Sequence, residues 1–266
     1  MQTDYVQELV AILERLRGPG GGPWDREQTH ATLKRYLIEE CGELLDTIDD
    51  GDDAAMVDEI GDVLLQLVFH CQIAREAGRF DLQAAARSEC EKMLRRHPHV
   101  FGDHPVATAA EVVGQWDRLK RHEERHARKT SAVEGVPRHL PALHRAQVVL
   151  RQAGKTGFEW GTLEAVLAKV HEELAEVEAA CAQRDLERVA EELGDLLFAV
   201  VNLCRWQQLE AEDLLQQAVR KFVRRFQDLE GTLKAQGRQI KNVPAEELLQ
   251  AWRQTAGHGP TSAPVP

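Results

Sequence analysis

The sequence has no apolar run long enough to cross a bilayer, and Met1 to Asp4 is not a basic stretch followed by an apolar one. We therefore expect no membrane span, no signal peptide and a cytoplasmic location. The five cysteines form no CxxC pair and are odd in number, which predicts reduced, partly buried thiols. No useful stretch alternates polar and apolar residues, so the predicted fold class is all-α.

Positive charge is also scarce. The chain has 33 Lys and Arg against 44 Asp and Glu, a formal net charge of −11, which argues against direct nucleic-acid binding. The basic cluster between Arg118 and Lys129 includes Glu123 and Glu124, and we interpret it as a solvated linker helix. If the substrate is an anion, cations must come from outside the chain or from a few placed Lys and Arg.

What the sequence does contain is one acidic pattern written twice. Each acid of the first copy lies 133 residues before its counterpart, a register that composition alone seldom produces. The chain is therefore interpreted as a tandem duplicated helical bundle. The first copy is Glu39, Glu40, Glu43, Asp58, Glu59 and Asp62. The second copy is Glu172, Glu173, Glu176, Glu191, Glu192 and Asp195.

Helical periodicity and turn residues give the expected elements. Helices are predicted over 4–17, 29–49, 53–78, 81–96 and 109–128, and over 140–153, 162–183, 185–209, 211–235 and 244–254. We expect a polar turn over 24–29 and a loop between Pro98 and Pro105. The expected domains are an N-terminal helical domain (1–125), a connector (126–160), a C-terminal helical domain (161–255) and a disordered tail (256–266).

Apolar stripes on the first repeated pair of helices predict a core between them. One stripe is Leu37, Cys41, Leu44, Leu45 and Ile48, and the other is Ile60, Val63, Leu64, Leu67, Val68 and Cys71. Residues three or four apart share a helical face, so Glu40 and Glu43 point together, as do Glu59 and Asp62. Packing two such helices brings four carboxylates into one cleft, where they repel by several kcal/mol at an effective dielectric constant of about 20.

A divalent metal ion would relieve that repulsion. Clusters made only of carboxylate oxygens suit Mg²⁺, with Mn²⁺ as the alternative. A di-iron bundle needs a Glu-x-x-His that neither copy has, and an EF-hand needs its acids in a loop. A solvated face explains a single copy equally well, but two copies in one register beside a predicted core favour a metal site.

These motifs resemble the MazG family of nucleoside triphosphate pyrophosphohydrolases in its two-domain form. The pattern E-E-x-x-E followed by E-x-x-D carries the resemblance, together with the runs GGPWDREQTH (21–30), RRHPHVFGD (95–103), KTGFEW (155–160) and VNLCRW (201–206). The resemblance extends to about Trp252. It implies an all-α NTP pyrophosphatase fold, Mg²⁺ and cleavage of an NTP to the monophosphate and pyrophosphate.

The resemblance also assigns roles to residues. It favours Glu172 as the catalytic residue that orients or deprotonates water, leaving Glu173, Glu176, Glu192 and Asp195 as metal ligands. It further favours Lys221 and Arg225 on phosphate and Trp252 near the nucleotide.

Other candidates come from spacing. Lys169 precedes Glu173 by four residues on the same face, so we expect it to touch phosphate. The first-unit counterparts of the acids and cations form a possible additional site that includes Glu39, Lys92 and Arg96.

The two copies differ at two positions near the acids. Under the 133-residue offset, Lys169 corresponds to Tyr36 and Asn202 to Phe69. An amide in an apolar run needs a hydrogen-bond partner, which a sugar or base could supply, and a satisfied core asparagine is the alternative. We hypothesise that the second unit is the better catalyst, with the first weaker, differently selective or structural.

Two other sequence features suggest a P-loop and a zinc site, but neither motif is complete. Gly154-Lys155-Thr156 imitates the end of a P-loop, but that motif needs glycine where the chain has Val149. His97, His99 and His104 lack a matching Cys/His framework, so zinc is not expected.

The sequence therefore predicts an Mg²⁺-dependent NTP pyrophosphohydrolase, of broad specificity and acting in nucleotide-pool control. A helical unit with one face exposed would bury that face against a second copy, so we expect a homodimer. Two alternatives stay open at this point. One is a narrower dNTP or dUTP pyrophosphatase, and the other is a non-catalytic helical module that senses nucleotide or metal.

Overall fold

The computed structural model describes residues 4–102, 108, 111–112 and 130–254. Over these residues the only regular elements are helices, which confirms the all-α class. The chain divides into two compact units, 1–127 and 128–266. None of the described helices combines the length and the apolarity needed to cross a lipid bilayer.

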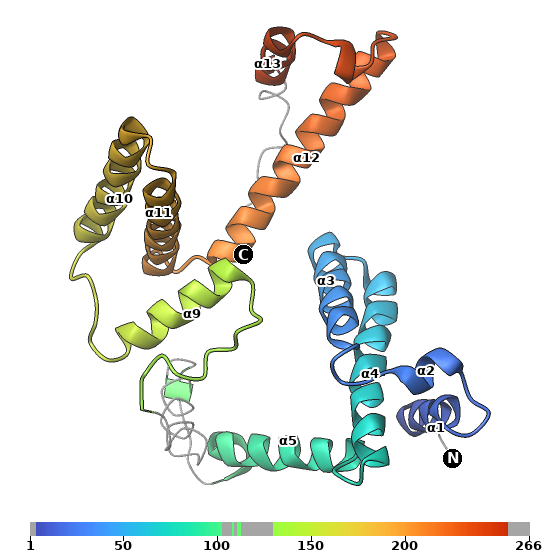
Figure 1. The fold of residues 1–266 in the computed structure, drawn as a ribbon. Coiled ribbons are helices and arrows are strands. Elements are labelled where there is room, and N and C mark those ends of the chain that lie inside the picture. Colours follow the sequence, from blue (N-terminus) through green and yellow to red (C-terminus); the bar gives the residue numbers. More distant parts are fainter. Residues whose placement is uncertain (1–3, 103–107, 109–110, 113–129, 255–266) are drawn as a thin grey trace. The chain divides into compact units, whose positions relative to one another are not determined.

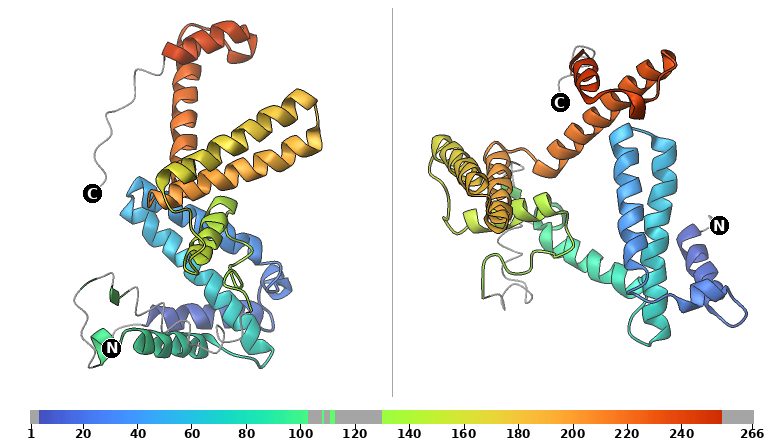
Figure 2. Two further views of the ribbon diagram at one scale, coloured as in Figure 1. Left: turned by 90° about the vertical axis from the view of Figure 1, so that its left-hand side faces the viewer. Right: turned by 45° about the horizontal axis from the view of Figure 1, so that its top comes forward.

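The first unit is built on an antiparallel pair of helices. Its elements are α1 (Tyr5–Arg17), α2 (Pro23–Glu27), α3 (Lys34–Asp50), α4 (Asp53–Glu76), α5 (Leu82–Arg96) and α6 (Pro98–Phe101). Helices α3 and α4 lie side by side in every view (Figures 1 and 2). Helix α1 packs against α4, and α5 continues from the far end of α4. The two repeated acidic runs therefore lie on neighbouring helices.

Aspartates and one glycine set the ends of these helices. Asp52 caps α4 by accepting hydrogen bonds from the backbone N–H groups of Ala54 and Ala55. Gly51 ends α3 in the left-handed region at φ 67°, which a residue without Cβ adopts at no steric cost. This short connection reverses the chain and places α4 against α3.

The second unit repeats the arrangement. Its elements are α9 (Ala142–Gly154), α10 (Leu163–Gln183), α11 (Leu186–Trp206), α12 (Ala211–Ala235), the 3₁₀ helix η1 (Ile240–Asn242) and α13 (Ala245–Gln254). Helices α10 and α11 form the antiparallel pair, α9 packs against α11, and α13 packs on α12 (Figure 1). Helix α11 starts 133 residues after α4, so the duplication extends to whole helices.

The predicted helices differ from the observed ones in three places. Residues 24–29 were expected to be a polar turn, but Pro23 opens the short helix α2 because its fixed φ suits a first helical position. The helix expected from residue 29 starts at Lys34, because Thr29 and Thr32 hold the preceding turn by hydrogen bonds. The expected loop after Pro98 begins with the short helix α6.

Some predictions concern residues outside the described ranges, and one concerns the expected connector. The predicted helix over 109–128, with its basic cluster, and the predicted tail over 256–266 lie outside the described residues, except for Glu111 and Val112. Helix α9 lies within the stretch that we expected to be a connector, and it packs against α11 and α12.

The predicted core stripes are only partly buried in a single chain. Val68 and Cys71 are buried, but Leu45 is 62% exposed and Ile48, Ile60 and Leu67 are also exposed. The prediction of a core along the whole pair was wrong, because two helices cover only one face of each other and α1 reaches only part of α4. All five cysteines are free as expected, yet Cys41, Cys90 and Cys181 are exposed rather than partly buried.

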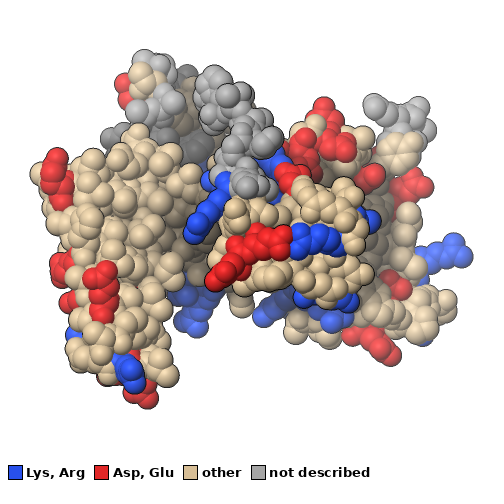
Figure 3. Space-filling model, turned by 90° about the horizontal axis from the view of Figure 1, so that it is seen from above, with Lys and Arg blue, Asp and Glu red and all other residues tan. Residues whose placement is uncertain are grey.

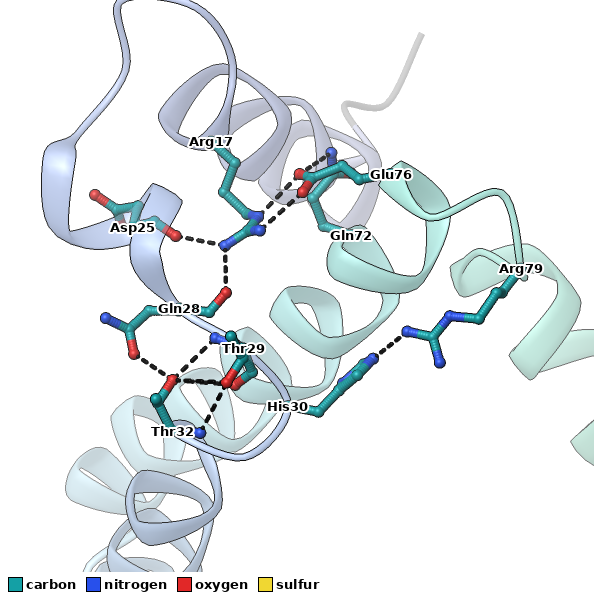
Figure 4. A network of polar contacts seen from close by, with 9 residues as sticks. All are labelled: Arg17, Asp25, Gln28, Thr29, His30, Thr32, Gln72, Glu76 and Arg79. Atoms are coloured by element: carbon teal, nitrogen blue, oxygen red, sulfur yellow. Dashed lines mark hydrogen bonds and ion pairs between the residues drawn. The ribbon is translucent and has the colours of Figure 1, made fainter.

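Arg17 ties the end of α1 to α4 and to the α2 segment (Figure 4). Its guanidinium, with 6% of the side chain exposed, donates to both Glu76 carboxylate oxygens at 2.9 and 2.8 Å. It also donates to the backbone carbonyls of Asp25 and Gln28. The hydrogen bonds from Arg17 lower the pKa of Glu76 below its usual range. One buried cation thus satisfies acceptors from two other segments, α4 and the α2 segment.

Replacing Arg17 with alanine should therefore lower the free energy of unfolding by about 1–3 kcal/mol, because the part-buried carbonyls of Asp25 and Gln28 and the Glu76 carboxylate lose their donor. Since the folded-state pKa of Glu76 is depressed, this stabilisation is present above the usual glutamate pKa and is lost as the pH falls through the folded-state value. Urea denaturation at pH 7 and at acid pH measures both effects. The control is Arg75→Ala, which breaks the exposed pair with Glu14 and should cost less than about 1 kcal/mol. Equal losses from the two variants would contradict the prediction.

Candidate active site

The second unit brings acids from two helices together. Glu173 on α10 and Glu192 and Asp195 on α11 each offer a carboxylate oxygen, and these oxygens lie within 4.8 Å of one another. Glu173 is 5% exposed and Glu192 is 8% exposed, so both carboxylates are held away from bulk water. Antiparallel packing of α10 on α11 is what makes the two acidic runs meet, as the spacing predicted.

Glu176 belongs to the same cluster. The neighbouring Glu192 carboxylate, followed by burial and by Glu173, raises the pKa of Glu176 above its usual range. A hydrogen bond between Glu176 and Glu192 contributes in the same direction. Four carboxylates therefore compete for the same space, and a proton or a cation must reduce their repulsion.

Two cations on the same helices reach these carboxylates. The Lys169 ammonium lies 2.6 Å from Glu173 Oε1 and 2.8 Å from Glu172 Oε1, and these contacts raise the pKa of Lys169. Arg188 Nε lies 3.2 Å from Glu192 Oε1. The shared face expected for Lys169 and Glu173 is thus confirmed. Arg188 was missed, although it precedes Glu192 by the same four residues.

The first unit repeats the acidic cluster. Glu40 and Glu43 on α3 and Glu59 on α4 offer oxygens within 4.8 Å of one another. Burial first, and then the charge of Asp62, raises the pKa of Glu40. Burial first, and then Glu43 and Asp62, raises the pKa of Glu59. All four predicted first-unit acids are therefore electrostatically coupled.

The carboxylates of both units fit a hard divalent cation. Glu59 Oε2 and Glu173 Oε2 are buried and have no hydrogen-bond partner, which is costly unless a ligand satisfies them. An open hollow at the start of α11 also exposes the charged groups of Asp185, Glu187, Arg188, Glu191, Glu192 and Asp195. Figure 3 shows that carboxylates and basic groups are both exposed on the surface. Oxygen ligands of this kind suit Mg²⁺, Mn²⁺ or Ca²⁺.

Other predicted site residues lie beside these clusters. Glu172 is exposed and is held by Lys169, and Glu39 is exposed on α3. Asn202 on α11 is buried, and its Oδ1 accepts a hydrogen bond from Arg205 Nε at 3.0 Å. Arg205 in turn donates to both oxygens of Glu159 at 2.7 Å. The side chain of Asn202 therefore already has one partner within the fold.

The remaining predicted cations lie on the helices that follow each pair. Arg225 on α12 stacks over the Trp252 ring, with its Cζ 4.1 Å from the centroid, and donates to the Trp252 carbonyl at 3.0 Å. Phe222 also contacts Trp252, with centroids 5.0 Å apart. Lys221 is exposed on α12. On α5, Lys92 pairs with Glu89 and Arg96 is half-buried.

Comparisons with a family model and with individual proteins all relate this chain to nucleotide pyrophosphohydrolases. The family model described as the MazG nucleotide pyrophosphohydrolase domain matches residues 28–101 and 161–229, so its second match begins 133 residues after its first. The chain is 44% identical over 251 residues to the nucleoside triphosphate pyrophosphohydrolase/pyrophosphatase MazG of Thermotoga maritima, covering 94% of this chain and 95% of that protein. It is 42% identical over 254 residues to a nucleoside triphosphate pyrophosphohydrolase of Escherichia coli, covering 94% of this chain and 97% of that protein.

The coupled acids predict how pH and Mg²⁺ affect stability. Because the folded-state pKa values of Glu40, Glu59 and Glu176 are raised, the metal-free protein should gain stability as the pH falls through those values toward the usual glutamate range. Mg²⁺ should stabilise more at pH 7.5 than at pH 5.5, because its ligands must be deprotonated. At about 100 times its dissociation constant, the gain is about 2.7 kcal/mol.

Thermal unfolding in EDTA and in Mg²⁺ at the two pH values measures this effect. The pH dependence in EDTA should shrink in a variant that carries Glu59→Gln and Glu176→Gln. Equal stabilisation by Mg²⁺ at both pH values would show that the carboxylates of Glu40 and Glu59 do not hold it.

Proposed function

The chain belongs to the MazG nucleotide pyrophosphohydrolase family, and on that basis we propose that it hydrolyses nucleoside triphosphates to the monophosphate and pyrophosphate with Mg²⁺, or Mn²⁺ in its place. The proposal rests on one observation: carboxylate oxygens of Glu173, Glu192 and Asp195 lie within 4.8 Å of one another, and Glu173 Oε2 is buried without a hydrogen-bond partner. We propose broad specificity among NTPs and a role in controlling the nucleotide pool of the cytoplasm.

The acidic chain can accept an anionic substrate because the metal reverses the local charge. When bound to the four second-unit carboxylates, the cation would polarise phosphoryl oxygens and lower the pKa of a bound water. Lys169, Lys221 and Arg225 would supply the direct contacts to phosphate. Trp252, already in contact with Arg225 and Phe222, would pack against the base, and Asn202 would use its remaining hydrogen-bonding capacity on sugar or base.

Glu172 is the proposed catalytic residue. It lies next to Glu173 in sequence but is exposed, and among the described residues it pairs with Lys169 at 2.8 Å. When Lys169 turns to the triphosphate, the Glu172 carboxylate becomes available to orient a water and accept its proton. That water forms a new P–O bond to one of the two phosphorus atoms at the α–β bridge, while the bond from that atom to the bridging oxygen breaks. The products are the nucleoside monophosphate and pyrophosphate. The work of the chain is positioning and charge stabilisation.

Product analysis separates this proposal from the alternatives. Monophosphate plus pyrophosphate from an NTP panel supports the enzyme, whereas diphosphate plus phosphate indicates an ordinary NTPase. Turnover of deoxynucleotides or dUTP alone indicates the narrower pyrophosphatase. Nucleotide binding without turnover identifies the sensing module.

We further propose that the second unit carries most of the activity. Glu173→Gln removes a buried carboxylate of that site and should lower kcat/KM about 100-fold or more. The matched variant Glu40→Gln changes the equivalent residue of the first unit and should leave most of the activity. Steady-state pyrophosphate release measures both. Equal losses would mean that the two units contribute alike.

A homodimer is the proposed state of the chain. On α3, Ile38, Leu45 and Ile48 are exposed, and on α4 Val57, Ile60 and Leu67 are exposed. A soluble monomer rarely leaves so many neighbouring large apolar side chains in water, whereas a second copy would bury them. Each α3–α4 pair would then complete its core against its counterpart.

Charged residues at this apolar face should dissociate the dimer. Leu45→Glu together with Ile60→Lys should convert a particle of about twice the chain mass into one of the chain mass, because burying these charges is costly. Light scattering after size exclusion measures the mass. Val133→Glu, a charge at an exposed apolar residue outside the α3–α4 pair, is the control. A monomeric wild-type protein would contradict the dimer.

A further inference from the structure

The two acidic clusters differ in the cations that already contact them. In the second unit, Lys169 Nζ lies 2.6 Å from Glu173 Oε1, and Arg188 Nε lies 3.2 Å from Glu192 Oε1. Both contacts join residues four apart on one helix, so the sequence builds each cation into the face that carries the acid. A divalent ion that binds there meets positive charge already in place.

The first unit keeps the acids but not the cations. At the positions 133 residues before Lys169 and Arg188 the chain has Tyr36 and Ala55. The Tyr36 hydroxyl accepts a hydrogen bond from Arg35 at 2.6 Å, and the Tyr36 ring packs edge-on against Trp24. Among the described residues, no lysine, arginine or histidine forms an ion pair with the acidic cluster of Glu40, Glu43, Glu59 and Asp62. The repulsion between these carboxylates is therefore uncompensated.

A neutral amide stands at the first cluster instead. Gln66 on α4 is buried, and its Nε2 lies 3.5 Å from Glu40 Oε1, the atom that corresponds to the Glu173 oxygen held by Lys169. Its counterpart in the second unit is Ala199. Gln66 Oε1 is buried without a hydrogen-bond partner, as is Glu59 Oε2. Two buried acceptors in the first cluster thus lack a donor or a cation.

We propose that the first unit holds a resident divalent cation on Glu40, Glu43, Glu59 and Asp62, with Gln66 as a positioning residue, and that the second unit takes up its cation only together with a triphosphate. The inference rests on the proposed function only for the second unit. In that unit the phosphates give Lys169 and Arg188 new partners and free the carboxylates for the metal. In the first unit nothing has to move before the cation binds, and Gln66 holds Glu40 without adding positive charge.

Titration of the full-length protein with Mn²⁺ in the absence of nucleotide tests the proposal, with free Mn²⁺ followed by electron paramagnetic resonance. One tight site per chain is expected. Glu40→Gln with Glu59→Gln should abolish it. The matched pair Glu173→Gln with Glu192→Gln should leave it in place. Circular dichroism and thermal unfolding in EDTA check that each variant is folded.

Exchanging the residues that differ between the two clusters gives a second, independent experiment. Lys169→Tyr with Arg188→Ala should create a second nucleotide-free site. Tyr36→Lys with Ala55→Arg should weaken the first site about tenfold or more, because each added charge opposes the cation at short range. Gln66→Ala should weaken Mn²⁺ binding while leaving the melting temperature in EDTA unchanged, which a purely structural role would not do.

Three outcomes would overturn the proposal. The first is two equal Mn²⁺ sites in the wild-type protein, and the second is no site without nucleotide. The third is loss of the tight site in the Glu173→Gln, Glu192→Gln variant but not in the Glu40→Gln, Glu59→Gln variant. Pyrophosphate release by the wild-type protein is measured separately. The proposed function can therefore fail while a resident cation is found, and the reverse can also occur.

Discussion

The rest of the structure depends on repulsion between carboxylates that two packed helices force together. In each unit an antiparallel pair, α3 with α4 or α10 with α11, brings acids from both helices within 4.8 Å. Burial raises the cost of leaving these charges unpaired, as the raised pKa values of Glu40 and Glu59 show. Without a metal ion this repulsion destabilises the fold, and a bound cation relieves it. Metal affinity is therefore a property of helix packing as much as of ligand type.

Duplication gave the chain two copies of this arrangement, and a few side chains made them different. Lys169 and Arg188 accompany the acids of the second unit, whereas Tyr36 and Ala55 occupy the equivalent positions in the first. Lys169 also links Glu172 to Glu173, so on our proposal phosphate binding by Lys169 also releases the catalytic carboxylate. In the first unit the neutral amide of Gln66 takes the place of that ammonium. On our proposal, the same scaffold holds one cation permanently and admits another with its substrate.

The sequence predicted much of the fold because its signals are local. The acids repeat at 133 residues, and the helices predicted from residues 4, 53 and 81 begin in the structure at Tyr5, Asp53 and Leu82, directly after the capping residues Asp4, Asp52 and Asp81. The exposure of Leu45 and Ile48 was not predicted, because periodicity shows that a face is apolar but not what covers it. Gln66 was missed, although it is an amide in an apolar run, the same signal that singled out Asn202. Arg188 was within reach, since its spacing to Glu192 equals that of Lys169 to Glu173.

The central claim is that the paired helices hold a divalent ion which carries the triphosphate. Anomalous diffraction from crystals grown with Mn²⁺ and a non-hydrolysable NTP analogue tests it most directly. The account predicts an anomalous peak among Glu173, Glu176, Glu192 and Asp195, in contact with phosphate oxygens of the analogue. A nucleotide bound with its phosphates away from these four carboxylates, or a cluster that contains no manganese, would contradict it.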